Sequence, residues 1–166
     1  MAPFPPISVR QPRAHDIVDE PVEVRGVGTG FEGVISARVR DGKGVELKEV
    51  SIRAGGTGIW GNFHARIDLP GVPNTARGTL EVFEESSGGG GGEMNKGVVP
   101  IVFGDKLVPG YVGFAQYTVE SGDTLSNIAQ QFYGDADRSR TIFQANRNQI
   151  DDPDVIFPGQ VLRIPQ

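Results

Sequence analysis

Residues 117–165 carry the densest pattern of the chain and read YTVESGDTLSNIAQQFYGDADRSRTIFQANRNQIDDPDVIFPGQVLRIP. Four apolar residues in this stretch share the spacing i, i+3, i+4 and i+7: Leu125, Ile128, Ala129 and Phe132. This spacing places their side chains on one face of a helix of about two turns. Asp123 or Thr124 supplies the oxygen that caps the free N–H groups of this helix, and Gly134 ends it.

A second helix is expected over residues 138–146, with Ile142 and Ala145 facing inward. Asp135 or Asp137 can cap it. The return segment after this helix holds Pro153 and Pro158, which exclude helix there. Residues 161–164 can then pair with the opening strand at 117–119. The stretch therefore predicts a small α+β unit of order β-α-α-β, with both helices on one face of a two-stranded sheet.

This pattern resembles the LysM domain over 49 residues. The residues that carry the resemblance are Tyr117-Thr-Val119, Ser121-Gly-Asp-Thr-Leu125, Ile128-Ala129, Phe132-Tyr133-Gly134-Asp135, Ile142-Phe143, Ala145-Asn146, Pro153-Asp154, Ile156, Pro158-Gly159-Gln160, Leu162 and Ile164-Pro165. One departure is Ser139, which stands where many members of the family carry a tryptophan that packs against the module.

The resemblance implies binding and not cleavage, because LysM modules bind glycans that contain N-acetylglucosamine, such as peptidoglycan or chitin. It implies a shallow groove between two loops, formed by Gly122, Asp123, Thr124 and Leu125 on one side and by Asp154, Ile156, Phe157, Pro158 and Gly159 on the other. Such a neutral sugar is bound by backbone donors and acceptors and a small apolar surface. Each of these residues also has a purely structural explanation in a turn, the helix cap or the small core.

Residues 1–104 show a different pattern, in which apolar residues alternate with polar ones and Gly, Pro and Asn interrupt them. We count seven strands: Ile7–Val9, Val22–Val27, Val34–Val39, Val45–Ile52, Ile59–Leu69, Thr79–Phe83 and Val98–Phe103. The Asp41-Gly42 turn favours a hairpin, with Gly42 at positive φ. The strands predict an all-β immunoglobulin-like sandwich whose core rests on Trp60, Phe63, Phe83 and the Val and Ile faces.

The order of residues in this part resembles the immunoglobulin-like domain of bacterial spore germination. The residues that carry the resemblance are Ile7-Ser-Val9, Pro21-Val22-Glu-Val-Arg-Gly26, Phe31-Glu32-Gly33, Val39-Arg40-Asp41, Gly61-Asn62-Phe63, Gly78-Thr-Leu-Glu-Val-Phe-Glu-Glu-Ser86 and Val98-Val-Pro-Ile101. The resemblance implies a fold and brings no catalytic residues with it.

We therefore expect three parts: an immunoglobulin-like β-sandwich at 1–104, a short apolar linker at 105–116 and a LysM module at 117–166. The linker holds Leu107, Val108 and Tyr111, so we expect it to pack on one or both domains. The glycine run Gly88–Gly92 lies between two expected strands, which favours a flexible hairpin tip.

Composition argues against several classes of function. The chain has 166 residues, no cysteine and a net charge of −5, so it offers no thiolate ligand or cysteine nucleophile and no basic face for nucleic acid. His15 and His64 are the only histidines and have no patterned partner, and Asp151, Asp152 and Asp154 lack the spacing of a calcium loop. We expect a protein that is not an enzyme, without cofactor, metal site or membrane insertion.

Two functions remain open. The first is a non-catalytic protein that binds peptidoglycan or another N-acetylglucosamine glycan, with the β-sandwich as a spacer or a docking domain for a protein partner. The alternative is an intracellular LysM adaptor or an ion-sensing protein, such as a potassium-binding protein or a component of a phage-tail-like assembly. The compartment depends on the start of the chain: the cell wall if a leader has been removed, or the cytoplasm if Met1 is the native start.

Overall fold

The computed structural model describes residues 6–86 and 92–166. The glycine run therefore lies outside the described residues except for Gly92. The strands of the N-terminal part are β1 (Ile7–Gln11), β2 (Asp16–Val18), β3 (Val22–Gly28), β4 (Val34–Asp41), β5 (Glu46–Arg53), β6 (Gly61–Ile67), β7 (Arg77–Glu85) and β8 (Glu93–Phe103), with a 3-10 turn η1 (Phe31–Gly33). The remaining elements are α1 (Gly104–Leu107), β9 (Phe114–Thr118), α2 (Leu125–Tyr133), η2 (Ala136–Arg138), α3 (Ser139–Ala145) and β10 (Val161–Pro165).

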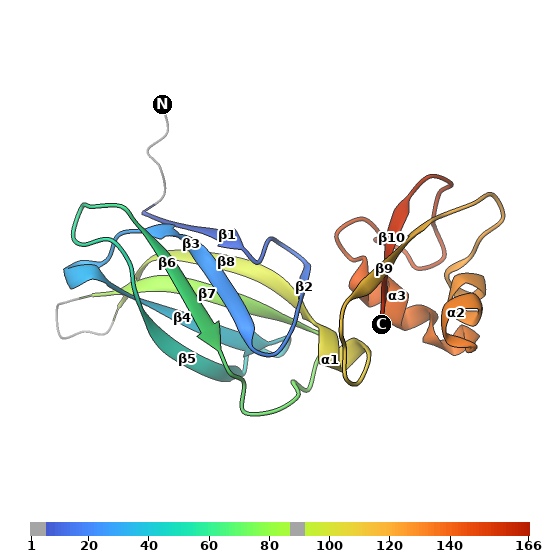
Figure 1. Ribbon diagram of the computed structural model, residues 1–166, viewed down its shortest axis with the longest axis horizontal. Coiled ribbons are helices and arrows are strands. Elements are labelled where there is room, and N and C mark those ends of the chain that lie inside the picture. Colours follow the sequence, from blue (N-terminus) through green and yellow to red (C-terminus); the bar gives the residue numbers. More distant parts are fainter. Residues whose placement is uncertain (1–5, 87–91) are drawn as a thin grey trace.

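The N-terminal strands form two sheets with the orders β1-β3-β6 and β2-β8-β7-β4-β5 (Figure 1). Neighbouring strands are antiparallel, except that β2 runs parallel to β8. A single apolar cluster joins the sheets, with members such as Val24 and Phe63 from the first sheet and Ile35, Leu80 and Ile101 from the second. This part of the molecule is strand-rich, as the alternating pattern predicts.

Three details differ from the sequence-based expectation. Trp60 is not a core residue: β6 begins one residue later, and 44% of Trp60 is exposed. Phe83 is buried but lies outside the apolar cluster, because side chains alternate along β7: Leu80 and Val82 enter the cluster, and Phe83 lies on the other face, with Arg38 over its ring. In the turn between β4 and β5 the positive φ of 82° falls on Gly44 and not on Gly42.

The sequence pattern also missed two short elements. Strand β2 has only three residues, too few for alternation to be visible. Helix α1 has four residues and begins directly after β8. Its Leu107 is buried with Val102 and Ala145, so it joins β8 to α3. The segment after β8 thus contacts both the strand-rich N-terminal part and the C-terminal part of the chain. The division of the chain at residues 104 and 116 stays a prediction.

The C-terminal part has the element order β9, α2, η2, α3, β10, and β10 pairs antiparallel with β9 from Val161↔Thr118 to Pro165↔Phe114. Strand β9 starts three residues earlier than expected. Thr124 caps α2, since its Oγ1 accepts a hydrogen bond from Asn127 N at 3.1 Å, and Gly134 ends the helix with a φ of 70°. The small core consists of Val119, Leu125, Ile128, Ala129, Ile142, Ile150, Leu162 and Ile164.

The two parts of the molecule touch through polar contacts as well. Arg163 on β10 donates from Nη2 to the backbone oxygen of His15 at 3.0 Å and to Asn148 Oδ1 at 2.7 Å. Among residues 6–86 and 92–166, no helix is long and apolar enough to cross a membrane.

Candidate functional site

A groove of about 490 Å³ lies in the C-terminal part, between the start of α2, the start of α3 and the return segment before β10. Five of the nine residues predicted to bind ligand line it: Asp123, Thr124, Leu125, Asp154 and Ile156. The other four do not line it: Gly122, Phe157, Pro158 and Gly159. The structure therefore brings the two predicted loops together, but only in part through the predicted side chains.

The first wall of the groove consists of residues that the fold already uses. Asp123 Oδ2 accepts hydrogen bonds from Glu120 N and from the Tyr117 hydroxyl, both at 2.8 Å. The hydrogen bond to Asp123 raises the pKa of Tyr117. Thr124 is the helix cap, and Leu125 is 3% exposed in the small core. This wall is rigid, because each polar side chain is held by backbone or hydroxyl partners.

The second wall is the return segment. Asp154 N donates to Asp152 Oδ1 at 2.9 Å, which fixes the turn that presents Asp154. Ile156 is half-buried and faces the groove. Phe157 follows it in the chain with 61% of its surface exposed and does not line the groove. A large exposed aromatic side chain can contribute strongly to binding, because a ligand that covers it removes much apolar surface from water.

The glycines of the prediction have structural roles in the turns. Gly122 has a φ of 92° and Gly159 a φ of 90°, a region that residues with a Cβ rarely adopt. Gly159 N also donates to Val119 O at 2.8 Å, which ties the return segment to the end of β9. Gly122 and Gly159 thus shape the two loops and do not line the groove themselves.

A third wall comes from α3 and was missed by the sequence-based prediction. Ser139, Arg140, Phe143 and Gln144 line the groove together with Ser126 and Pro153. Their positions follow the i, i+4 rule, since Ser139 lies one turn before Phe143 and Arg140 one turn before Gln144. The prediction that Ile142 and Ala145 face inward is confirmed. The residues beside them on the helix surface, at positions 139, 140, 143 and 144, are those that line the groove.

The chemistry of the groove suits a polar ligand that carries small apolar groups. Ile156 and Phe143 contribute apolar surface, while the hydroxyl of Ser139 and the amide of Gln144 can donate and accept hydrogen bonds. The lining also contains one cation, Arg140, and two carboxylates, Asp123 and Asp154. Within the described ranges no three His, Asp or Glu side chains gather in a way that could hold a metal ion.

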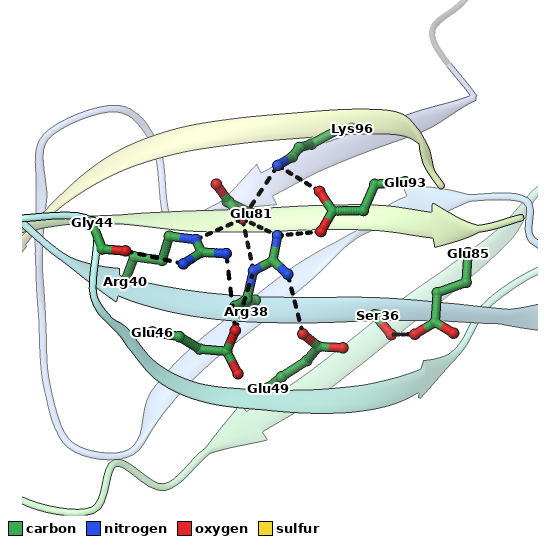
Figure 2. Close-up of polar contacts among 10 residues, drawn as sticks. All are labelled: Ser36, Arg38, Arg40, Gly44, Glu46, Glu49, Glu81, Glu85, Glu93 and Lys96. Carbon is green, nitrogen blue, oxygen red and sulfur yellow. Dashed lines mark hydrogen bonds and ion pairs between the residues drawn. The ribbon is translucent and has the colours of Figure 1, made fainter. Parts of the chain in front are cut away.

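The largest cluster of charged groups lies elsewhere, on β4, β5, β7 and β8 (Figure 2). Arg38 is at its centre, donating from Nε to Glu81 at 2.8 Å and from Nη2 to Glu93 at 2.6 Å. Its guanidinium also covers the ring of Phe83 at 4.6 Å from the centroid, which explains why Phe83 is buried outside the core. Figure 2 shows cations and carboxylates that share partners, with Glu81 contacted by Arg38, Arg40 and Lys96, as expected of a structural network.

Comparison with family models gives the two parts their identity. Residues 6–91, just over half of the chain, match the model described as the immunoglobulin-like domain of bacterial spore germination. The chain belongs to this family. Residues 117–165 match the LysM domain. The immunoglobulin-like domain and the LysM domain therefore follow each other in the order expected from the sequence. Both are types of domain that bind and do not catalyse.

Individual relatives match over the length of one domain. The potassium-binding protein Kbp of Escherichia coli is 58% identical over 50 residues, which is 30% of this chain and 34% of Kbp. The secreted LysM effector ECP6 of Passalora fulva is 45% identical over 61 residues, 37% of this chain and 24% of the effector. An esterase of Mycobacterium tuberculosis is 50% identical over 52 residues, 31% of this chain and 11% of the esterase.

The chain covers about a third or less of the length of the curated relatives it matches. The similarity to the esterase lies in the LysM region. No solved structure matches the chain.

The third wall contains the residue at which this chain departs from the LysM pattern. Ser139 lines the groove at the position where many LysM domains carry a tryptophan. Ser139 shares this wall with Arg140, Phe143 and Gln144.

Proposed function

We propose that this protein binds glycans containing N-acetylglucosamine, above all peptidoglycan, in the groove of its LysM domain, without cleaving them. The observation that carries the proposal is the meeting of the two predicted loops in one groove: Asp123, Thr124 and Leu125 face Asp154 and Ile156 across it. The match to the LysM domain and to a LysM effector supports the same reading.

The proposed contacts follow from the chemistry of the walls. Ile156 and Phe143 offer apolar surface to the methyl group of an N-acetyl substituent, and Phe157, next to Ile156 in the chain, adds an exposed ring. Ser139 and Gln144 supply the hydrogen bonds that orient a sugar. Gly122, Pro158 and Gly159 act in this proposal through the shape and backbone of their loops.

The remaining parts of the chain have supporting roles in this proposal. In this proposal, residues 1–104 are an immunoglobulin-type sandwich and residues 117–166 are a β-α-α-β LysM module. Residues 105–116 are the linker between these two domains. The sandwich serves as a spacer or as a docking domain for a protein partner. A single LysM domain binds weakly, so several copies on one surface would raise retention through avidity.

The test compares two neighbouring side chains of the return segment. Ile156→Ala removes apolar surface from the groove, whereas Val155→Ala alters a side chain that is 46% exposed and does not line it. We expect Ile156→Ala to weaken binding to an N-acetylglucosamine tetramer about fivefold, corresponding to roughly 1 kcal/mol of lost burial. Val155→Ala should bind as the unaltered protein does. Equal affinity of both variants in titration calorimetry would refute the groove assignment.

A second candidate function rests on the similarity to Kbp, whose printed name is potassium binding protein. In this alternative the chain is an intracellular adaptor or ion sensor. It predicts that potassium chloride raises the melting temperature more than sodium chloride at equal ionic strength, because an ion that binds only the folded state stabilises it. That result, together with no detectable glycan binding, would favour the alternative over our proposal.

A further inference from the structure

A second and larger groove, of about 840 Å³, lies between the two domains. The immunoglobulin-like domain contributes the turn between β4 and β5, the segment before β7 and the end of β8. Lys106 and Leu107 of α1 and three residues of α3 complete it. Leu107 is also buried against Val102 and Ala145, so the same helix that lines this interdomain groove holds the two domains together.

The interdomain groove is adjacent to the groove of the LysM domain. Arg140 and Gln144 on α3 line both of them. A ligand long enough to pass Arg140 and Gln144 would reach both grooves at once.

The charges of the interdomain groove are predominantly positive. Arg77, Lys106 and Arg140 line it and are all exposed, and none of them forms an ion pair with any residue in the described part of the chain. The one carboxylate in the lining is Asp41, which is 3% exposed. Its Oδ1 accepts hydrogen bonds from Lys43 N and Val45 N, both at 2.9 Å. Three cations and one carboxylate leave two net positive charges.

This charge is not a consequence of a basic chain, since the protein as a whole carries a net charge of −5. The cations of the sheet surface, Arg38, Arg40 and Lys96, are each paired with glutamates. Unpaired cations that converge on a concave surface attract anionic ligands, and a concave low-dielectric wall strengthens that attraction. Two net charges are too few for the phosphate backbone of a nucleic acid but suit one or two carboxylates.

We propose that the interdomain groove binds the carboxylate-bearing peptide substituents of a peptidoglycan strand whose N-acetyl sugars occupy the LysM groove. This inference rests on the proposed function and names its substrate class more narrowly. Arg77 and Lys106 hold the carboxylates, and Arg140 lies where the sugar chain passes from one groove to the other. Ala76, Pro100 and Leu107 provide apolar surface beside them for the alkyl parts of the peptide.

The experiment measures the affinity of the full chain for two probes by titration calorimetry. One probe is a neutral N-acetylglucosamine tetramer, and the other is a peptidoglycan tetrasaccharide that retains its acidic stem peptides. The test variant is Arg77→Gln with Lys106→Gln. The control variant is Lys48→Gln with Arg53→Gln, which removes the same charge from exposed positions on β5 outside the groove.

We expect the unaltered protein to bind the acidic probe about tenfold more tightly than the neutral one, a gain that falls with added salt. The test variant should lose this gain and keep its affinity for the neutral probe, while the control variant should keep both. If the neutral probe binds but the acidic probe gains nothing, or the test variant keeps the gain, the inference is wrong and the proposed function stands. If neither probe binds, both fail.

Discussion

Asn146 is a polar residue of the LysM domain whose side chain is fully buried and joins two parts of the chain. Its Nδ2 donates to Ile142 O at 2.8 Å and to Arg163 O at 2.7 Å, and its Oδ1 accepts from Arg163 N at 2.8 Å. These bonds connect the end of α3 to β10. Asn146 at this position of the LysM pattern therefore has a structural role that does not depend on a ligand.

We predict that Asn146→Ala lowers the free energy of unfolding by about 2–4 kcal/mol, because it leaves several buried backbone groups without partners. The measurement is denaturant unfolding followed by circular dichroism. Asn127→Ala, at an exposed position on α2, is the matched control and should change stability by no more than about 0.5 kcal/mol. A similarly small effect at Asn146 would show that these hydrogen bonds contribute little.

At the scale of elements, the five-stranded sheet carries the charged network of Figure 2, which makes its stability depend on pH. Burial raises the pKa of Glu81, but hydrogen bonds from Arg38 and Arg40 outweigh burial and lower it. Hydrogen bonds from Lys96 and Arg38 lower the pKa of Glu93. A carboxylate with a lowered pKa in the folded state stabilises the fold above its unfolded pKa and ceases to do so as the pH falls through the folded value.

We therefore predict that the protein loses stability as the pH falls from neutrality to below about 4.5, the ordinary glutamate pKa, and that Glu93→Gln makes this loss smaller. Urea midpoints at pH 7 and pH 3.5 measure it. Glu84→Gln, which alters a glutamate paired only with Asn95 among the described residues, should leave the pH dependence as it is. An identical loss in the Glu93 variant would contradict the role assigned to the network.

At the scale of helices and strands, some features could be predicted from the sequence and others could not. The apolar spacing in α2 and its end at Gly134 were readable, because helix periodicity and glycine conformation are local properties. The exposure of Trp60 was not readable, because it depends on where β6 begins, whereas the alternation of β7 places Phe83 on the face opposite to the core residues Leu80 and Val82. Likewise, the α3 wall of the groove follows from how the return segment folds over the helix, which is a tertiary property.

At the scale of the whole molecule, the two domains are joined by more than a tether. Leu107 packs with Val102 and Ala145, and Arg163 donates to the backbone of His15. These contacts place α3 beside the immunoglobulin-like domain, so that one helix borders both grooves. The apolar residues of the linker indicated that it packs on one or both domains, but not that it meets α3, because the four-residue helix α1 is too short to leave a periodic signal.

The central claim is that the LysM groove between α2, α3 and the return segment binds N-acetyl sugars. The most direct measurement is the change of amide chemical shifts in the isotope-labelled full chain on titration with an N-acetylglucosamine tetramer. We predict that the largest changes cluster at Thr124, Ser139, Gln144, Asp154 and Ile156, which line the groove. Changes confined to the two sheets of the immunoglobulin-like domain, or no changes at millimolar ligand, would contradict the claim.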